Sequence, residues 1–168
     1  MKARAPMIAA WLALLLPAFL LGGALIGQYG FGLYPCEMCF WQRWPHWAAL
    51  GLGALAVLSV RRVPRLAIGM AGLAGVAIAI SGLIGGFHAG VEYGWWQGIT
   101  GCAASMPSGA STDDVLDSIM AAPLVRCDAP QWTLGGISMA GYNFILSLAG
   151  AASIFLLIRR RKTGSIAA

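Results

Sequence analysis

Four long apolar stretches without a charged residue limit what this chain can fold into. They cover residues 6–27, 44–60, 66–87 and 137–158. A bilayer core about 30 Å thick is crossed by a helix of roughly 20 apolar residues, so each stretch can cross it, the second at the short end of the range. Only 10% of the residues are charged, against about 25% in a soluble domain. We therefore expect an all-α, four-transmembrane-helix bundle, with residues 1–168 forming a single integral membrane domain.

The first stretch has one rival interpretation, a cleaved signal peptide. Lys2 and Arg4 provide the basic residues that precede such a peptide. The apolar run from 6 to 27 is longer than the usual apolar region of about 7–15 residues, however, and no convincing cleavage site follows it. We expect a retained first helix.

The distribution of charge predicts how the bundle is oriented. Of the 11 Lys and Arg residues, all but Arg43 and Arg126 lie before the first stretch, between the second and third, or after the fourth. If the helices alternate, these places share one side, which the positive-inside rule makes cytoplasmic. We expect both termini on that side and two outer loops, about 28–43 and 88–136. The net charge of +5 then reflects orientation rather than a nucleic-acid-binding face.

All four cysteines fall in the two outer loops. Cys36 and Cys39 form a C-x-x-C motif in the first, and Cys102 and Cys127 lie in the second. Thiols outside the cytoplasm tend to be oxidised, and the simplest of the three possible pairings joins Cys36 to Cys39 and Cys102 to Cys127. These disulfides could be structural. A zinc site is disfavoured because Cys102 and Cys127 are far apart in sequence, so we expect no metal.

The C-x-x-C spacing favours redox chemistry over a structural role. Its disulfide closes a very small ring and restrains little chain, whereas the same spacing lets one thiolate reach the other sulfur. We expect the second helix to begin within a few residues of Cys39, where its positive end favours a thiolate. Arg43, one helical turn later, could stabilise that thiolate and donate to an oxygen-rich cofactor. An arginine that extends to the membrane interface is the alternative.

The segment Pro35-Cys36-Glu37-Met38-Cys39-Phe40-Trp41-Gln42-Arg43 resembles the disulfide bond formation protein B (DsbB) family. Its members are bacterial inner-membrane enzymes that reoxidise the periplasmic oxidase DsbA and pass electrons to quinone. The resemblance covers essentially the whole chain. It implies an enzyme with periplasmic cysteines, a DsbA-like thioredoxin-fold partner, ubiquinone or menaquinone as cofactor, and no nucleic-acid partner.

The resemblance also implies a role for each cysteine. Cys102 would form the mixed disulfide with the soluble partner, and Cys127 would pass the electrons to Cys36. Cys39 would be the thiolate at the quinone ring, with Arg43 beside it.

Three other residues are weaker candidates for the quinone pocket. His46 lies close to Arg43 in sequence and could position a quinone carbonyl, or could simply be an interfacial histidine. His88 and Glu92, four residues apart at the outer end of the third helix, could line the pocket or form a local pair. In the second outer loop, apolar residues recur at helical spacing between Ser111 and Pro123, which predicts a short amphipathic helix on the membrane surface.

Two alternatives of different kinds remain. One is a thiol oxidoreductase of the vitamin K epoxide reductase type, against which the order of the motifs argues, because the C-x-x-C precedes the second helix. The other is a non-catalytic membrane subunit whose disulfides are only structural.

Overall fold

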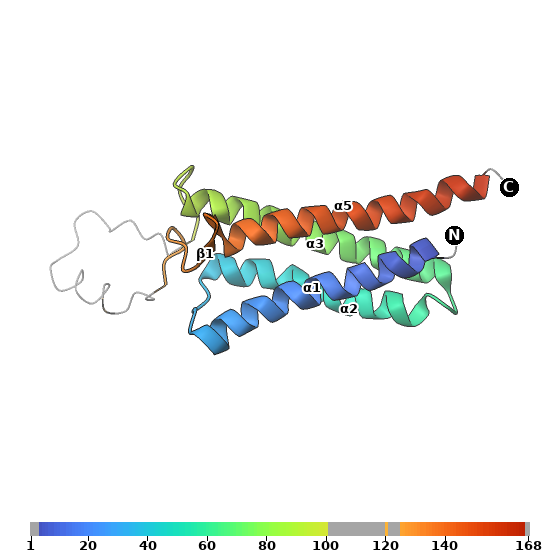
Figure 1. Cartoon of the computed structure of the whole chain (residues 1–168), viewed down its shortest axis with the longest axis horizontal. Coiled ribbons are helices and arrows are strands. Elements are labelled where there is room, and N and C mark those ends of the chain that lie inside the picture. Colours follow the sequence, from blue (N-terminus) through green and yellow to red (C-terminus); the bar gives the residue numbers. More distant parts are fainter. Residues whose placement is uncertain (1–3, 101–119, 121–124, 167–168) are drawn as a thin grey trace.

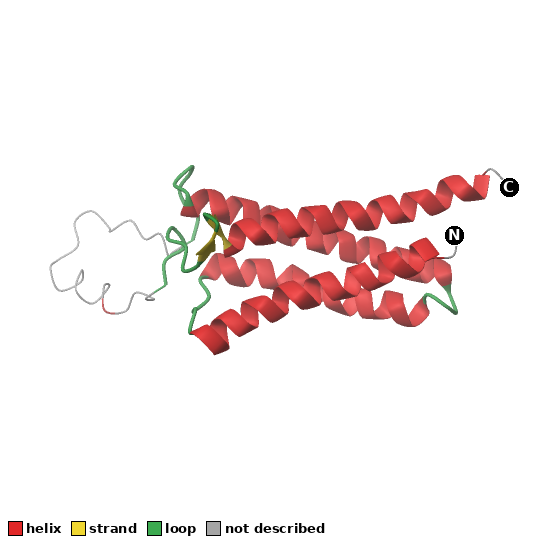
Figure 2. Cartoon of the chain, in the orientation of Figure 1, coloured by secondary structure: helices red, strands yellow, loops and turns green. Residues whose placement is uncertain are grey.

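Four long helices lie side by side in a bundle, and both termini lie at the same end of it (Figure 1). The structure is a computed structural model that describes residues 4–100, 120 and 125–166. The helices are α1 (Arg4–Phe31), α2 (Glu37–Ser59), α3 (Pro64–Glu92) and α5 (Met139–Ile166). Apart from one short hairpin, the described part of the chain is all-helical (Figure 2). The four helices expected from the sequence are confirmed.

The helices extend beyond the apolar stretches, and α2 differs most. It begins at Glu37, seven residues before the apolar stretch at 44, which confirms the expected start within a few residues of Cys39. Cys39 and Arg43 belong to the helix rather than to a loop over 28–43. The local cause is Cys36, whose extended backbone and side-chain acceptor make it the N-cap. Its sulfur accepts the Cys39 N–H and thereby satisfies one of the donors left free at a helix start.

The fourth helix begins slightly later than expected. Residues 137–138 do not start it but form strand β2 (Ile137–Ser138), which pairs antiparallel with β1 (Thr133–Leu134). Gly135 and Gly136 join the strands, and both have positive φ, as a tight hairpin turn requires. The helix expected between Ser111 and Pro123 lies outside the described residues, apart from Met120.

Three helices are long and apolar enough to cross a membrane: α1, α3 and residues Met139–Arg160 of α5. Among the described helices α2 falls short of the same measure, because Glu37, Gln42, Arg43 and His46 lie in its first half. That α2 is the fourth crossing stays a prediction.

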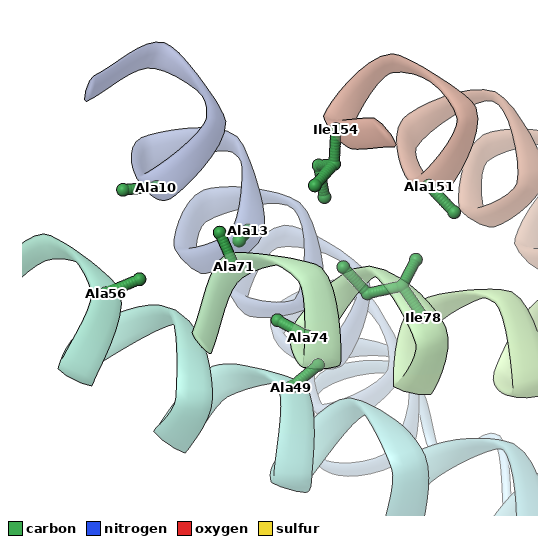
Figure 3. Close-up of a cluster of buried hydrophobic side chains, with 9 residues drawn as sticks. All are labelled: Ala10, Ala13, Ala49, Ala56, Ala71, Ala74, Ile78, Ala151 and Ile154. Carbon is green, nitrogen blue, oxygen red and sulfur yellow. The ribbon is translucent and has the colours of Figure 1, made fainter. Parts of the chain in front are cut away.

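Small side chains let the helices approach closely. The buried centre of the bundle is mostly alanine, drawn from all four helices (Figure 3). In lipid, where apolar burial gives little drive for helix association, close backbone approach through small residues is what holds helices together. The tightest such place between α1 and α2 is Gly53, where an added Cβ would lie 2.5 Å from the carbonyl oxygen of Ala13.

We expect Gly53→Ala to destabilise the bundle by about 1–3 kcal/mol, the usual cost of overpacking, because backbone of α1 must move. Gly51→Ala is the matched control, since a Cβ there meets nothing within 4 Å and the same helix gains the propensity of alanine. Thermal denaturation in detergent measures both variants. Equal midpoints for the two would contradict this account of the α1–α2 contact.

Candidate thiol-redox site

Two cysteines meet at the start of α2. The sulfur atoms of Cys36 and Cys39 are 2.9 Å apart, and both residues are free thiols. Cys36 is buried, whereas Cys39 is half-buried. The hydrogen bond to the Cys39 sulfur and burial raise the pKa of the Cys36 thiol. In the reduced pair the negative charge therefore belongs on Cys39, in the first turn of the helix, where the helix dipole stabilises a thiolate.

A third cysteine reaches this pair from the second loop. Cys127 is fully buried and packs with Cys36, Met38 and Val91. The segment that carries it lies at the same end of the bundle as the start of α2 (Figure 1). Cys127 also accepts a hydrogen bond from the Thr100 hydroxyl, at 3.4 Å. The structure thus brings together three of the four predicted cysteines, and Cys102 lies outside the described residues.

Arg43 connects the thiol pair to α1. Its guanidinium donates to the side-chain oxygen of Gln28 at 2.5 Å and to the carbonyl oxygen of Ala24 at 3.3 Å. It also lies 5.5 Å from the centre of the Phe40 ring, within cation–π range. The Arg43 side chain thus joins α2 to α1.

His88 and Glu92 form the local pair that their spacing allows. The His88 Nε2 atom lies 3.7 Å from Glu92 Oε1 and 3.6 Å from the Cys36 sulfur. His46 lies deeper in the bundle, where its Nε2 atom is 2.9 Å from Asn143 Oδ1. His88 is therefore at the thiol pair itself, while His46 is tied to α5.

Sequence reasoning missed four polar residues that join these histidines: Gln42, Ser81, Asn143 and Ser147. All four make hydrogen bonds inside the bundle. The available signal was their position, because Ser81, Asn143 and Ser147 interrupt stretches that are otherwise apolar. Polar residues inside a membrane helix are costly and usually face the bundle interior.

A cavity of about 610 Å³ opens beside the thiols. Its walls are mainly apolar side chains of α1, of α5 and of the segments that precede α2 and α5, and its polar lining includes Cys36, Cys39, Gln42, Arg43 and His46. His88, Glu92 and Asn143 line it too. An apolar cavity with a few converging polar groups suits a flat ring that carries oxygen atoms.

The thiol cluster also has the spacing of a metal site. One ligand atom each from Cys36, His88 and Cys127 lies within 4.8 Å of the others. Sulfur exchange between Cys36 and Cys127 needs the same proximity, so this spacing does not by itself indicate a metal.

Fold and site together define a helical membrane protein with a cluster of exchangeable thiols at one end of its bundle. The sequence matches the model of the disulfide bond formation protein DsbB family over residues 6–157, nearly the whole chain, and the protein belongs to that family. It is similar to the uncharacterized protein RP370 of Rickettsia prowazekii (strain Madrid E). The two are 27% identical over 130 residues, which is 76% of this chain and 73% of the relative. No solved structure matches.

The contact between Cys36 and Cys127 can be tested directly. In a Cys39→Ser, Cys102→Ser variant each of the two remaining thiols has lost its predicted partner. We expect mild oxidation to join them, because their sulfur atoms already lie within 4.8 Å and exchange needs only a small movement. Mass spectrometry of proteolytic fragments detects the bond. A chain that stays fully alkylatable after oxidation would contradict the placement of Cys127.

Proposed function

We propose that this protein is a thiol:quinone oxidoreductase that reoxidises a periplasmic DsbA-like dithiol oxidase and so sustains disulfide bond formation. One observation carries the proposal within a chain of the DsbB family. Cys127, from the second loop, is buried against Cys36, and the Cys36–Cys39 pair lines an apolar cavity. The sulfur atoms are thus in series between the soluble side and a site for a lipid-soluble acceptor.

The exchange steps follow from this series. A thiolate of the reduced partner attacks Cys102 of a Cys102–Cys127 disulfide, and the partner's second thiol completes its own disulfide. The Cys127 thiolate then attacks Cys36 of a Cys36–Cys39 disulfide, and Cys39 leaves as a thiolate. Finally Cys102 attacks Cys127, which restores the disulfide of the second loop and leaves Cys36 and Cys39 reduced. Each step breaks one S–S bond and forms one.

The cavity beside Cys39 is the proposed quinone site. A bound quinone supplies the acceptor for two electrons and two protons. The protein holds the Cys39 thiolate at the cavity wall and provides the positive charge of Arg43. The apolar side chains of the cavity limit the access of water. His46, His88 and Glu92 complete the proposed polar lining.

The proposed location is the bacterial inner membrane, with α2 as a fourth crossing. Both termini lie at one end of the bundle and the start of α2 at the other (Figure 1). With the basic residues near the termini on the cytoplasmic side, the thiol cluster faces the periplasm.

Oxidation of a reduced DsbA-like protein tests the function. We expect the purified chain to oxidise it catalytically when quinone is added, and to stop after about two equivalents without quinone, one for each of its two disulfides. Cys39→Ser should lose quinone reduction, because the thiolate at the cavity is gone, yet should still react once through Cys102 and Cys127. Quinone absorbance and the partner's thiols are followed together.

Two outcomes would contradict the assignment. Quinone reduction that survives in Cys39→Ser would remove Cys39 from the acceptor site. A wild-type chain that is inert toward the partner, with quinone present, would favour the structural-disulfide alternative.

Replacing Arg43 tests its proposed contact with quinone. Arg43→Lys keeps the charge but loses the planar fork, and Arg43→His is mostly neutral near pH 7. Losing one charge-assisted hydrogen bond costs about 1.5–3 kcal/mol, so we expect a roughly 10–100-fold higher apparent KM for quinone, largest for histidine. Quinone titrations at matched protein level measure it.

Gln28→Ala is the control for the Arg43 experiment. It removes a hydrogen bond from the same guanidinium but leaves the charge in place, so the KM for quinone should change little. Wild-type kinetics in both Arg43 variants would reduce Arg43 to an anchor between α1 and α2.

A further inference from the structure

Two side-chain amides inside the bundle, one buried and one half-buried, connect the two histidines of this protein. Gln42 lies on α2 and Asn143 on α5, and the Asn143 Nδ2 atom is 2.9 Å from Gln42 Oε1. Gln42 continues to His88 on α3, and Asn143 continues to His46 on α2. In an apolar bundle each donor must face an acceptor, because a donor that faces another donor is left without a hydrogen bond, which costs free energy. The direction of every hydrogen bond in the chain can therefore be worked out.

The backbone carbonyl of Ser81 fixes Asn143. This oxygen can only accept, and it lies 3.2 Å from Asn143 Nδ2, so that atom of the amide is the donor. The opposite atom, Oδ1, accepts from the Ser147 hydroxyl at 2.9 Å and from His46 Nε2 at 2.9 Å. The Gln42 atom that faces Asn143 Nδ2 must in turn be an acceptor, which is Oε1.

A second backbone carbonyl fixes Gln42 independently. Its Nε2 atom lies 3.2 Å from the carbonyl oxygen of Met38, and the same Nε2 is 2.9 Å from His88 Nδ1. Because an amide nitrogen only donates, Nδ1 of His88 must carry a lone pair. The proton of a neutral His88 is then on Nε2.

That N–H faces the thiol pair. His88 Nε2 is 3.6 Å from the Cys36 sulfur and 3.7 Å from Glu92 Oε1. In this state the nitrogen of His88 that faces Cys36 already carries a proton, so it has no lone pair with which to take the proton of Cys36. A second proton, on Nδ1, would face the N–H of Gln42, so that two donors would oppose each other.

From this geometry we propose that Gln42, oriented by Asn143, is a positioning residue that holds His88 neutral and prevents it from acting as a base toward Cys36. The inference rests on the proposed thiol-exchange function and deepens it. In cysteine–histidine pairs that ionise the thiol, the group behind the histidine is an acceptor. Here it is a donor. The titratable groups close to His88 are Cys36 at the N-cap of α2, Glu92 on α3 and Cys127 before β1, and Cys39 and Arg43 of α2 line the same cavity. With His88 neutral, the thiolate of the reduced pair stays on Cys39, at the cavity.

Gln42→Glu tests the proposal, because it replaces the amide donor that faces Nδ1 of His88 with a carboxylate acceptor. A carboxylate accepts from Nδ1, so His88 becomes an imidazolium that pairs with a Cys36 thiolate. The chain has two histidines, so nitrogen-15 labelling of histidine gives two assignable rings in the reduced, detergent-solubilised protein. We expect a neutral, Nε2-protonated His88 at pH 7 in wild type and a doubly protonated His88 in Gln42→Glu.

Alkylation of Cys36 gives the second measurement. Peptide mass spectrometry follows the rate at each cysteine across pH 5–9. We expect the Cys36 rate near pH 6.5 to rise about tenfold or more in Gln42→Glu, which corresponds to a shift of one pH unit or more in its titration. Ser147→Ala is the matched control. It removes one hydrogen bond to Asn143 but replaces no donor with an acceptor. The nitrogen-15 signal of His88 and the pH dependence of Cys36 alkylation should therefore match wild type.

Either of two results would overturn the proposal. One is a wild-type His88 that carries a proton on Nδ1, which needs no variant to be seen. The other is a Gln42→Glu chain with a wild-type His88 signal and Cys36 profile. The His46 signal reports whether the network persists in each variant. Neither measurement uses quinone or the partner protein, so failure here is distinct from failure of the proposed oxidoreductase activity.

Discussion

A polar group inside an apolar bundle must find its hydrogen-bond partner within the protein, because neither lipid nor packed side chains offer one. This constraint shapes the molecule at three levels. It favours helices, which satisfy their own backbone. At the start of α2 it is met by a sulfur, since Cys36 accepts the Cys39 N–H. In the bundle interior it forces Gln42, Ser81 and Asn143 into one network.

The thiol site follows from how α2 begins. An N-cap residue and the residue three positions later lie on the same side of the first turn, so a C-x-x-C placed there brings its sulfur atoms together. The two thiols differ in surroundings. Both line the cavity, but Cys36 is buried against Cys127, whereas Cys39 is half-buried. Cys36 is thus suited to exchange with the second loop, and Cys39 is the more accessible of the two thiols.

Much of the fold could be predicted from the sequence, because apolar stretches of membrane length leave few alternatives to helices. The start of α2 was predictable from the C-x-x-C motif, which placed it near Cys39, but not from hydropathy, since Glu37, Gln42 and Arg43 make its first turns look like a loop. The hairpin before α5 was hidden in an apolar run whose first two residues pair with Thr133 and Leu134.

The candidate site was predictable where its residues are close in sequence or carry a motif. The cysteines and Arg43 have such a signature. The amide network has none, because its partners are far apart along the chain: Gln42 and Asn143 are 101 positions apart. A single glutamine or asparagine in an apolar helix indicates that a hydrogen-bond partner is needed. Only the packing of α2, α3 and α5 determines which residue that partner is.

The direction of the Gln42 amide has a consequence for metal ions. A thiophilic ion such as Zn²⁺ binds imidazole through a lone pair, and the histidine normally donates its other N–H to an acceptor behind it. His88 has the reverse arrangement: its proton points at the sulfur atoms, and Gln42 donates from behind. Cys36, Cys127 and His88 have the spacing of a soft-metal site, but the histidine is turned against coordination. In its reduced form this thiol cluster is thereby less readily occupied by zinc.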